Sequence, residues 1–217
     1  TAIVKMLCEN LDTVYWYMRS DSRSPHIKRN DHNPNYLSSV EFKTSQLHLS
    51  SDINEIINLV DYCIFAIPSA FVYTELKELT VSLKDKVIFS AIKGIVPETG
   101  KIVGEHFHDE YELDFQNIGV LTGPCHAEEV ALERLSYLTI ACADEEKAKF
   151  IAERVSSDYI NCKISDDIIG TEYAAMLKNI YAIAAGIAHG LGYGDNFQSV
   201  LMSNAIREMK RFIKKVH

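Results

Sequence analysis

The 217-residue chain carries 22 Lys and Arg against 30 Asp and Glu, so its formal net charge is −8. Its 47% hydrophobic and 24% charged residues are typical of a soluble globular chain with material for one or two domains. The acidic balance argues against a nucleic-acid-binding protein, which would present a basic face, and no apolar run approaches the roughly 20 residues that span a bilayer.

The first part of the chain alternates between expected helices and strands. A helix is predicted over 2–11, and a β-branched, aromatic strand over 13–18. The polar stretch 19–39 contains Pro25 and Pro34 and is predicted to be a long excursion. Further along we expect a helix capped by Ser51 or Asp52, a strand over 62–67 that is covered on both faces, a helix over 69–83, a strand over 87–91, a helix from the late 90s to Glu110 and a strand over 117–121.

The second part of the chain becomes helical. After Gly123 and Pro124 we expect, in order, a short helix, a strand over 136–142, a helix over 145–155 and a strand over 158–163. Two long helical segments follow, over about 167–191 and 195–215. Alternating strands and helices predict a parallel sheet with right-handed crossovers. The expected fold class is therefore an α/β parallel-sheet domain followed by an all-α domain, with the boundary near 165.

The five cysteines are odd in number and widely scattered: Cys8, Cys63, Cys125, Cys142 and Cys162. They match neither a metal-ligand spacing nor the disulfide framework of a small secreted protein. Lys5, Glu9 and Asp12 interrupt the apolar residues that a signal peptide would need. We therefore expect a cytoplasmic protein with reduced cysteines and no bound metal.

Candidate site residues follow the expected strands, because ligands of open parallel sheets bind beyond the carboxyl ends of the strands. These residues are Arg19 and the segments 68–71, 92–94 and 122–127. Gly94 and Gly123 would let the backbone approach a ligand closely, and the segment 124–129 opens a helix whose N-terminus favours an anion. Lys93 is either a ligand or a solvated charge.

Lys178 lies in the first long helical segment. Residues at helical offsets of three, four and seven share its face, and most are small or apolar: Thr171, Ala174, Ala175, Tyr181, Ala182 and Ala185. One interpretation is close helix packing with the ammonium reaching water. The other is a partly desolvated amine that exchanges protons near neutral pH. Asn179 is either a polar partner of this lysine or a buried amide.

Three other groups are weaker candidates. Cys125 and His126 could form a thiol–imidazole pair, but neighbours in sequence point different ways and no orienting acid is evident. His106, His108 and Asp109 could bind a metal, although residues two apart do not share a helix face. The basic residues at the end of the chain are expected to form a solvated helix face.

Four motifs, in this order, resemble those of the NAD(P)-dependent glycerol-3-phosphate dehydrogenases, in particular the bacterial form. They are AIPSAF at 66–71, SAIKG at 90–94, TGPCHAEEVA at 122–131 and the long stretch 172–196, which contains Leu177-Lys178-Asn179 and GLGYGDN at 190–196. The last motif is the most specific, because related hydroxyacid dehydrogenases share the helical lysine and asparagine but not the glycine-rich tail.

The resemblance implies a Rossmann-like dinucleotide-binding domain over 1–165 that lacks its first strand and glycine-rich turn. The start of a helical substrate and catalytic domain is implied over 166–217. In the family the glycine-rich turn cradles the pyrophosphate just before the helix at 2–11, so we expect this turn upstream of Thr1. Further helices, with the rest of the substrate phosphate site and an acidic partner of the lysine, are expected after the last residue.

The implied activity is reversible hydride transfer between sn-glycerol 3-phosphate and NAD or NADP, which supplies phospholipid synthesis when dihydroxyacetone phosphate is reduced. The cofactor supplies the hydride chemistry, while Lys178 is expected to carry the proton and stabilise the developing oxyanion. The family usually has a hydroxyl residue at position 125, and the Cys125 thiol bonds more weakly. The resemblance implies substrate binding by Lys93, Gly123, Cys125, Lys178 and Asn179, and cofactor binding by Arg19, Phe71, Lys93 and Ala127.

Coenzyme preference is expected to depend on Arg19. An acidic residue at the end of the second strand of a dinucleotide fold binds the ribose hydroxyls of NAD and repels the extra phosphate of NADP. Here the strand ends in Arg19 and Ser20, and the first acid is Asp21. Arginine donors suit a phosphate, so NADP(H) is expected to be preferred with NAD(H) still usable. The alternative is that Arg19 stacks on adenine and serves either coenzyme.

Two rival functions stay open. One is a sister hydroxyacid or ketoacid oxidoreductase of the same architecture. The other is a non-catalytic nucleotide-binding module, which the missing glycine-rich turn favours. The expected partner is a small phosphorylated substrate, without nucleic acid or membrane insertion, and a homodimer is compatible with these expectations.

Overall fold

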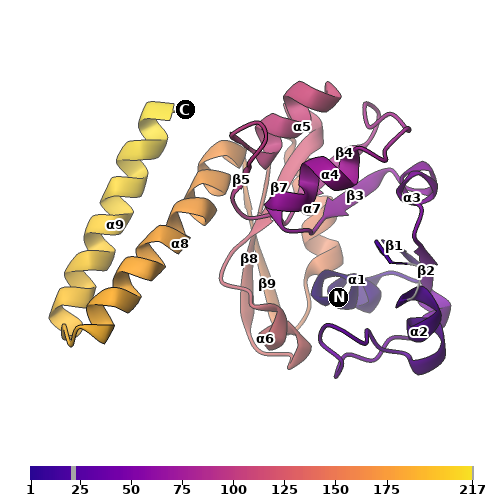
Figure 1. Cartoon of the computed structure of the whole chain (residues 1–217), viewed down its shortest axis with the longest axis horizontal. Coiled ribbons are helices and arrows are strands. Elements are labelled where there is room, and N and C mark those ends of the chain that lie inside the picture. Colours follow the sequence, from indigo (N-terminus) through magenta and orange to yellow (C-terminus); the bar gives the residue numbers. More distant parts are fainter. Residues whose placement is uncertain (21–22, 217) are drawn as a thin grey trace.

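The computed structural model describes residues 1–20 and 23–216. A body of sheet and helices is followed by a pair of long helices, α8 (Ile168–Gly190) and α9 (Asp195–Val216), which stand beside it (Figure 1). The pair is joined by a short turn in which Gly192 has φ +81°. This arrangement confirms the predicted α/β part followed by a helical part.

The larger sheet has five strands in the order β3-β4-β7-β8-β9. These strands are β3 (Tyr62–Phe65), β4 (Val87–Ser90), β7 (Ile118–Thr122), β8 (Ser136–Cys142) and β9 (Ile160–Ser165). Their neighbours pair in parallel except β7 and β8, which are antiparallel, so the prediction of a parallel sheet is wrong at this pair. The connection between them holds only the five-residue helix α6 (Ala127–Ala131), which is too short to return the chain to the opposite end of the sheet.

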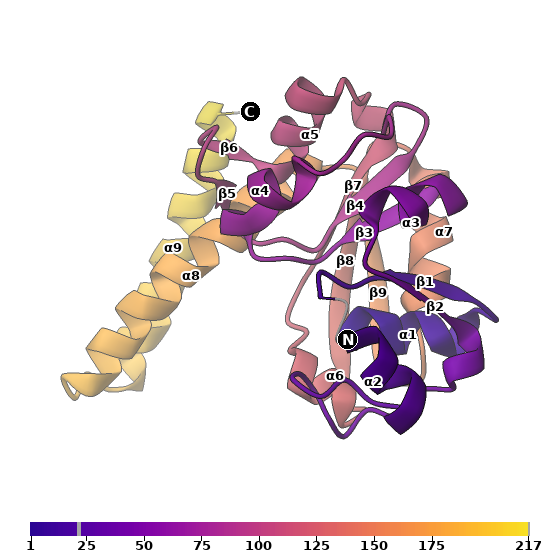
Figure 2. The same cartoon turned by 45° about the vertical axis from the view of Figure 1, so that its right-hand side comes forward.

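A smaller parallel sheet pairs β1 (Val14–Tyr17) with β2 (Leu47–Ser50) beside the β3 edge (Figure 2). The sequence predicted β1 and missed β2, where only Leu47 and Leu49 are buried. Between them the predicted excursion contains a helix, α2 (Arg23–Asn30), with Pro25 in its first turn, where proline is tolerated. The short 3₁₀ turn η1 (Thr44–Gln46) leads into β2.

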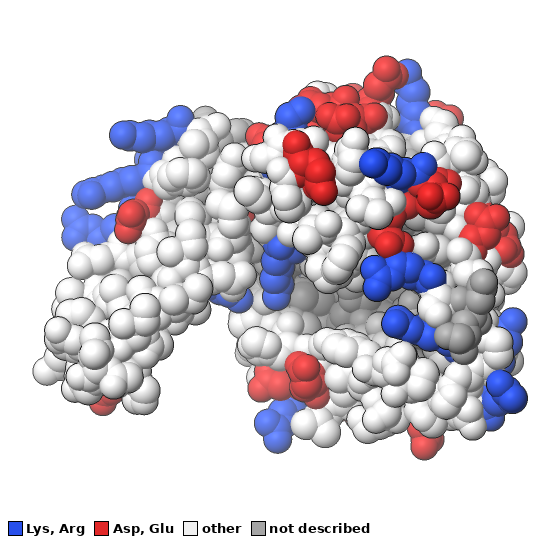
Figure 3. All heavy atoms as spheres, viewed as in Figure 1, with Lys and Arg blue, Asp and Glu red and all other residues white. Residues whose placement is uncertain are grey.

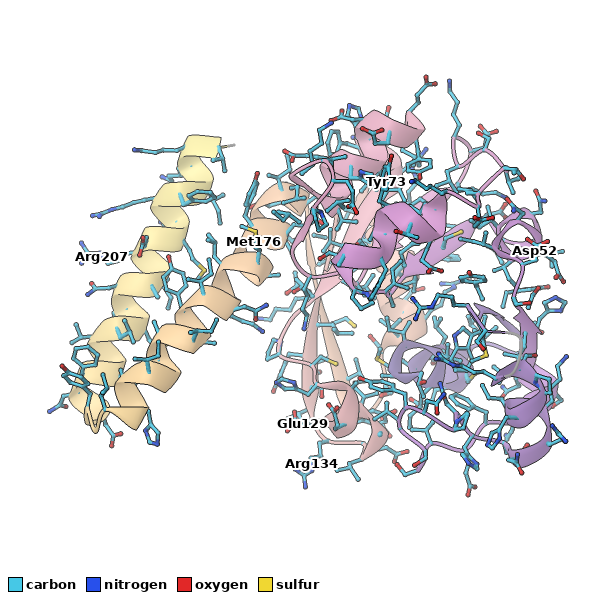
Figure 4. All side chains as sticks on the ribbon, viewed as in Figure 1. Asp52, Tyr73, Glu129, Arg134, Met176 and Arg207 are labelled. Carbon is cyan, nitrogen blue, oxygen red and sulfur yellow. The ribbon has the colours of Figure 1, made fainter. Side chains whose placement is uncertain are left out.

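Three predicted helices begin and end close to their expected limits: α1 (Ala2–Asn10), α3 (Ile53–Leu59) and α7 (Glu145–Val155). Asp52, labelled in Figure 4, caps α3 by accepting hydrogen bonds from the backbone N–H groups of Asn54 and Glu55. Asp144 caps α7 in the same way. In both helices a short polar side chain just before the apolar periodic segment therefore marks the start.

Two predicted helices are wrong in extent. The helix expected over 69–83 is the 3₁₀ turn η2 (Ser69–Phe71) and α4 (Val72–Leu76). Beyond it the backbone N–H groups of Thr80 and Val81 donate to the side chain of Asn54, which holds the chain in a non-helical path.

The helix expected from the late 90s begins only at Val103. An antiparallel hairpin of β5 (Ile95–Val96) and β6 (Lys101–Ile102) precedes it, and Gly100 in the turn has φ +68°. The helix itself is α5 (Val103–Tyr111), and the 3₁₀ turn η3 (Phe115–Asn117) leads into β7. A positive φ at a glycine is a turn feature that the helical pattern did not reveal.

A buried carboxyl group joins α8 to the sheet part. Oε2 of Glu172 accepts a hydrogen bond of 2.9 Å from the backbone N–H of Gly104 in the first turn of α5. This contact replaces a side-chain cap, because the N-cap residue of α5 is Ile102. Within the described chain Oε1 of Glu172 has no hydrogen-bond partner. Burial, with a smaller contribution from Glu105, raises the pKa of Glu172 to about 7.

This raised pKa predicts a stability effect with a defined sign. Between the ordinary carboxyl pKa and pH 7 the folded chain keeps a proton that the unfolded chain has lost, so the Glu172 contribution to stability falls as the pH rises through this window. Glu172→Gln removes this dependence. We expect the free energy of unfolding of the variant minus that of wild type to increase by about 3 kcal/mol from pH 4.5 to pH 7.5. A difference that is constant with pH, measured by urea unfolding, would contradict the assignment.

The paired helices leave much of their apolar surface exposed. Ile180, Ile183 and Ile187 on α8 are 57%, 66% and 59% exposed. No helix within residues 1–20 and 23–216 combines the length and the apolar character needed to cross a membrane.

Candidate functional site

A cavity of about 820 Å³ lies where β1, β3, β4 and β7 end, beside the N-terminus of α1. Figure 3 shows this face hollowed, with Lys and Arg side chains around the hollow. The predicted site residues on its wall are Arg19, Phe71, Lys93, Gly123, Cys125 and Ala127. The structure therefore brings together residues from four separate strand ends.

Arg19 lies between an aromatic ring and a carboxylate. Its guanidinium carbon is 5.2 Å from the centroid of the Phe71 ring, and Nη1 is 3.4 Å from Oε1 of Glu75. The hydroxyl of Tyr17 donates to Oε2 of the same carboxylate at 3.3 Å. Burial and the neighbouring Glu75 raise the pKa of Tyr17, so its hydroxyl stays a donor. Asp21, the acid expected just after this strand, lies outside the described residues.

Gly123 lies in the turn directly after β7. Its φ is +139°, and a Cβ at this position would collide with the backbone carbonyl oxygen of Tyr137. The turn after β4 is also specialised: the backbone N–H of Ile92 donates to Oγ of buried Ser90, and Gly94 has φ +106°. Lys93, between them, is exposed on the cavity wall.

Cys125 and Ala127 follow Gly123 on the same wall. Burial raises the pKa of the Cys125 thiol, which disfavours the reactive thiolate and argues against a nucleophilic role. The helix that opens here, α6, has only five residues, so it offers an anion a weaker dipole than the sequence indicated. The nine-residue helix α1 presents its N-terminal residues Ala2 and Ile3 to the cavity instead.

Lys178 and Asn179 are not brought onto this wall. Both lie on α8 and are exposed, so neither the partly desolvated amine nor the buried amide considered from the sequence is present in the described chain. Arg207 on α9 lies still further out, on the side of that helix that faces away from the sheet (Figure 4).

The histidine-rich segment does not form a metal site. His106 is buried, and burial lowers its pKa, while the Nδ1–H of His108 donates to the carbonyl oxygen of Leu113 at 2.6 Å. Asp109 pairs with Lys101 at 2.7 Å. No group of three or more His, Cys, Asp or Glu side chains arranged for a metal ion occurs in the described part of the chain.

Sequence reasoning missed several residues of the wall. Glu75 follows Phe71 by four residues, a spacing that already placed both on one face of the helix predicted over 69–83, but no motif marked Glu75 as a site residue. Asn33 and Tyr36 come from the excursion, and the Asn33 amide donates to the hydroxyl of Thr1 at 2.9 Å. No sequence pattern indicated that this excursion folds back over the start of α1.

Comparisons with known proteins agree with this geometry. The family models of the N-terminal and C-terminal parts of NAD-dependent glycerol-3-phosphate dehydrogenase match residues 1–148 and 167–217. A glycerol-3-phosphate dehydrogenase (NAD(P)+) of an Exiguobacterium species is 36% identical over 97% of this chain and 62% of its own length. The enzyme of the same name from Staphylococcus haemolyticus is 33% identical over 100% of this chain and 65% of its own length.

A solved structure gives the same result for the fold. The glycerol-3-phosphate dehydrogenase of Plasmodium falciparum superimposes with a TM-score of 0.85 at 25% identity, over 96% of this chain and 61% of that one. The chain thus spans about 62–65% of the length of the curated relatives it matches. With family models matching both its sheet part and its helical part, the chain belongs to the NAD-dependent glycerol-3-phosphate dehydrogenase family.

Proposed function

We propose that the complete natural protein interconverts sn-glycerol 3-phosphate and dihydroxyacetone phosphate with NADP(H) or NAD(H), and so supplies glycerophospholipid synthesis. The observation that carries this proposal is the cavity at the strand ends, where Arg19, Phe71, Lys93 and Gly123 meet in a chain of this family. Dinucleotides bind at this place in Rossmann-like sheets.

The cavity residues fit a dinucleotide. Arg19 and Phe71 offer a cation and an aromatic face at the end of β1, which suits an adenosine with or without a 2′-phosphate. Gly123 has no Cβ to collide with the carbonyl oxygen of Tyr137, so the turn after β7 can close tightly at the cavity, and Lys93 and Ala127 line the same wall. When bound, the cofactor supplies the hydride chemistry, and the protein orients it and handles one proton.

For the substrate we propose contacts from Lys93, Gly123, Cys125, Lys178 and Asn179, with Lys178 as the proton carrier. Lys178 would act as general base toward the alcohol, or as general acid toward the developing alkoxide. Neither Lys178 nor Asn179 lines the cavity, so the support for their roles is the family resemblance. Lys93, Gly123 and Cys125 are supported by their place on the wall.

The remaining expectations are also proposals. One is a domain boundary near 165, which is supported by the end of the last sheet strand, β9, at Ser165 and the start of the long helix α8 at Ile168. We also propose a cytoplasmic location, for which the support is the widely scattered cysteines, without a disulfide framework in the sequence. A homodimer is the proposed assembly.

Arg19→Ala tests the proposed preference for NADPH. Removing the guanidinium takes away the cavity-wall cation beside Phe71 and should lower kcat/KM for NADPH by about tenfold while changing that for NADH much less. The measurement is kcat/KM for both coenzymes in wild type and variant. A wild-type enzyme without NADPH preference, or a preference that survives the substitution, would overturn the assignment.

The reaction itself is tested by following NADPH oxidation by the complete natural protein with dihydroxyacetone phosphate and with a panel of 2-ketoacids. Turnover confined to dihydroxyacetone phosphate is the expected result. Turnover confined to ketoacids would establish the sister oxidoreductase instead, and nucleotide binding without any turnover would establish the non-catalytic module.

A further inference from the structure

The cavity wall carries an acidic side chain beside the residue proposed to select the coenzyme. Glu75 is the sole Asp or Glu on this wall among residues 1–20 and 23–216. Its side chain is 14% exposed, against 53% for Arg19. Oε1 faces Nη1 of Arg19 at 3.4 Å, and Oε2 accepts the hydrogen bond of Tyr17 at 3.3 Å. Both carboxylate oxygens are therefore engaged by residues at the end of β1.

The position of Glu75 is fixed by the core. Val72 and Leu76 in α4 are 0% and 2% exposed, so the short helix is anchored on its inner side. Phe71, four residues before Glu75, reaches Arg19 from the same segment. One segment thus supplies both the ring that Arg19 lies over and the carboxylate that holds it there.

A carboxylate at this place affects the two coenzymes in opposite directions. The 2′-phosphate of NADP carries a charge of about −1.5 to −2, so Glu75 would repel it and compete with it for the Arg19 guanidinium. The free ribose hydroxyls of NAD can donate hydrogen bonds to a carboxylate. In NAD-specific folds the acidic residue after the second strand accepts these hydrogen bonds. Glu75 would therefore perform this acidic role from a different segment of the chain.

We propose that Glu75 is a specificity-determining residue, which holds Arg19 over Phe71 and limits the preference for NADPH so that NADH is also used. This inference rests on the proposed function of the cavity as the dinucleotide site. Arg19 attracts the phosphate, Glu75 opposes it, and the balance of the two sets the ratio of affinities.

The test is calorimetric titration of the complete natural protein with NADPH and with NADH. Glu75→Gln keeps the shape and the Tyr17 contact but removes the charge. It should increase the ratio Kd(NADH)/Kd(NADPH) about tenfold over wild type. Glu75→Asp withdraws the carboxylate from Arg19 and should shift the ratio in the same direction by a smaller factor. If the Glu75→Gln variant fails to fold, the affinity ratio of the Glu75→Asp variant tests the proposal.

The matched control is Glu78→Gln, which removes a charge three residues further along and outside the cavity wall. Its affinity ratio should stay within twofold of wild type. An unchanged or decreased ratio in the Glu75 variants, with both nucleotides still bound, would overturn this inference alone. A folded wild-type protein that binds neither nucleotide would overturn the proposed function as well.

Discussion

Replacing Lys178 by alanine is expected to lower kcat of the complete enzyme at least about 100-fold, because general acid–base catalysis contributes roughly 10²–10⁴-fold. The substitution should leave the fold intact. Lys178 is exposed within α8, and alanine is the residue best suited to a helix interior. The measurement is kcat for dihydroxyacetone phosphate reduction, together with thermal unfolding of the variant.

Lys210→Ala is the matched control, because Lys210 is an exposed lysine in the neighbouring long helix α9. We expect its kcat to equal that of wild type. A Lys178→Ala variant that kept more than about a tenth of wild-type kcat would remove Lys178 from the proton-transfer step.

The second large effect is expected for Gly123→Ala. The left-handed φ of +139° is strained for any residue with a Cβ, and the added carbon would meet the carbonyl oxygen of Tyr137, which is backbone and cannot swing aside. Strain and overpacking together should destabilise the protein by about 3 kcal/mol or more. In a protein of this size that corresponds to a fall of about 6–12 °C in Tm, and the displaced turn should also weaken binding in the cavity.

Gly186→Ala provides the control for this change. Gly186 lies inside α8, and among the described residues no neighbour beyond its own helical turn comes within 4 Å of the place that a Cβ would take. Alanine should therefore be neutral there or raise stability by up to about 1 kcal/mol. Equal melting temperatures for the Gly123→Ala variant and wild type would show that the turn after β7 tolerates a side chain.

The sequence predicted the parts of the fold that depend on residues close together in the chain, such as helix caps and glycine-rich turns. Asp52 and Asp144 cap α3 and α7 where the apolar period begins, and the glycines around Tyr193 separate the two long helices. The direction of β8 could not be predicted, because it depends on how far the chain travels between strands. The hairpin at β5 and β6 was missed because a positive φ at Gly100 is a turn property that periodicity does not detect.

The candidate site was predictable where topology alone places residues. Arg19, Lys93 and Gly123 each follow a strand, and the ends of these strands meet at one cavity. Glu75 was missed because it does not directly follow a strand, and its contact with Arg19 depends on how two distant segments pack. The sequence left two environments open for Lys178, because a helical pattern shows which residues share a face, but not whether another element covers that face.

The most direct test of the account is a crystal structure of the complete natural protein with NADPH. We expect a dinucleotide in the cavity at the strand ends, with its adenosine against Arg19 and Phe71 and its remaining length along Lys93, Gly123 and Ala127. A dinucleotide bound elsewhere on the protein, with this cavity empty, would contradict it.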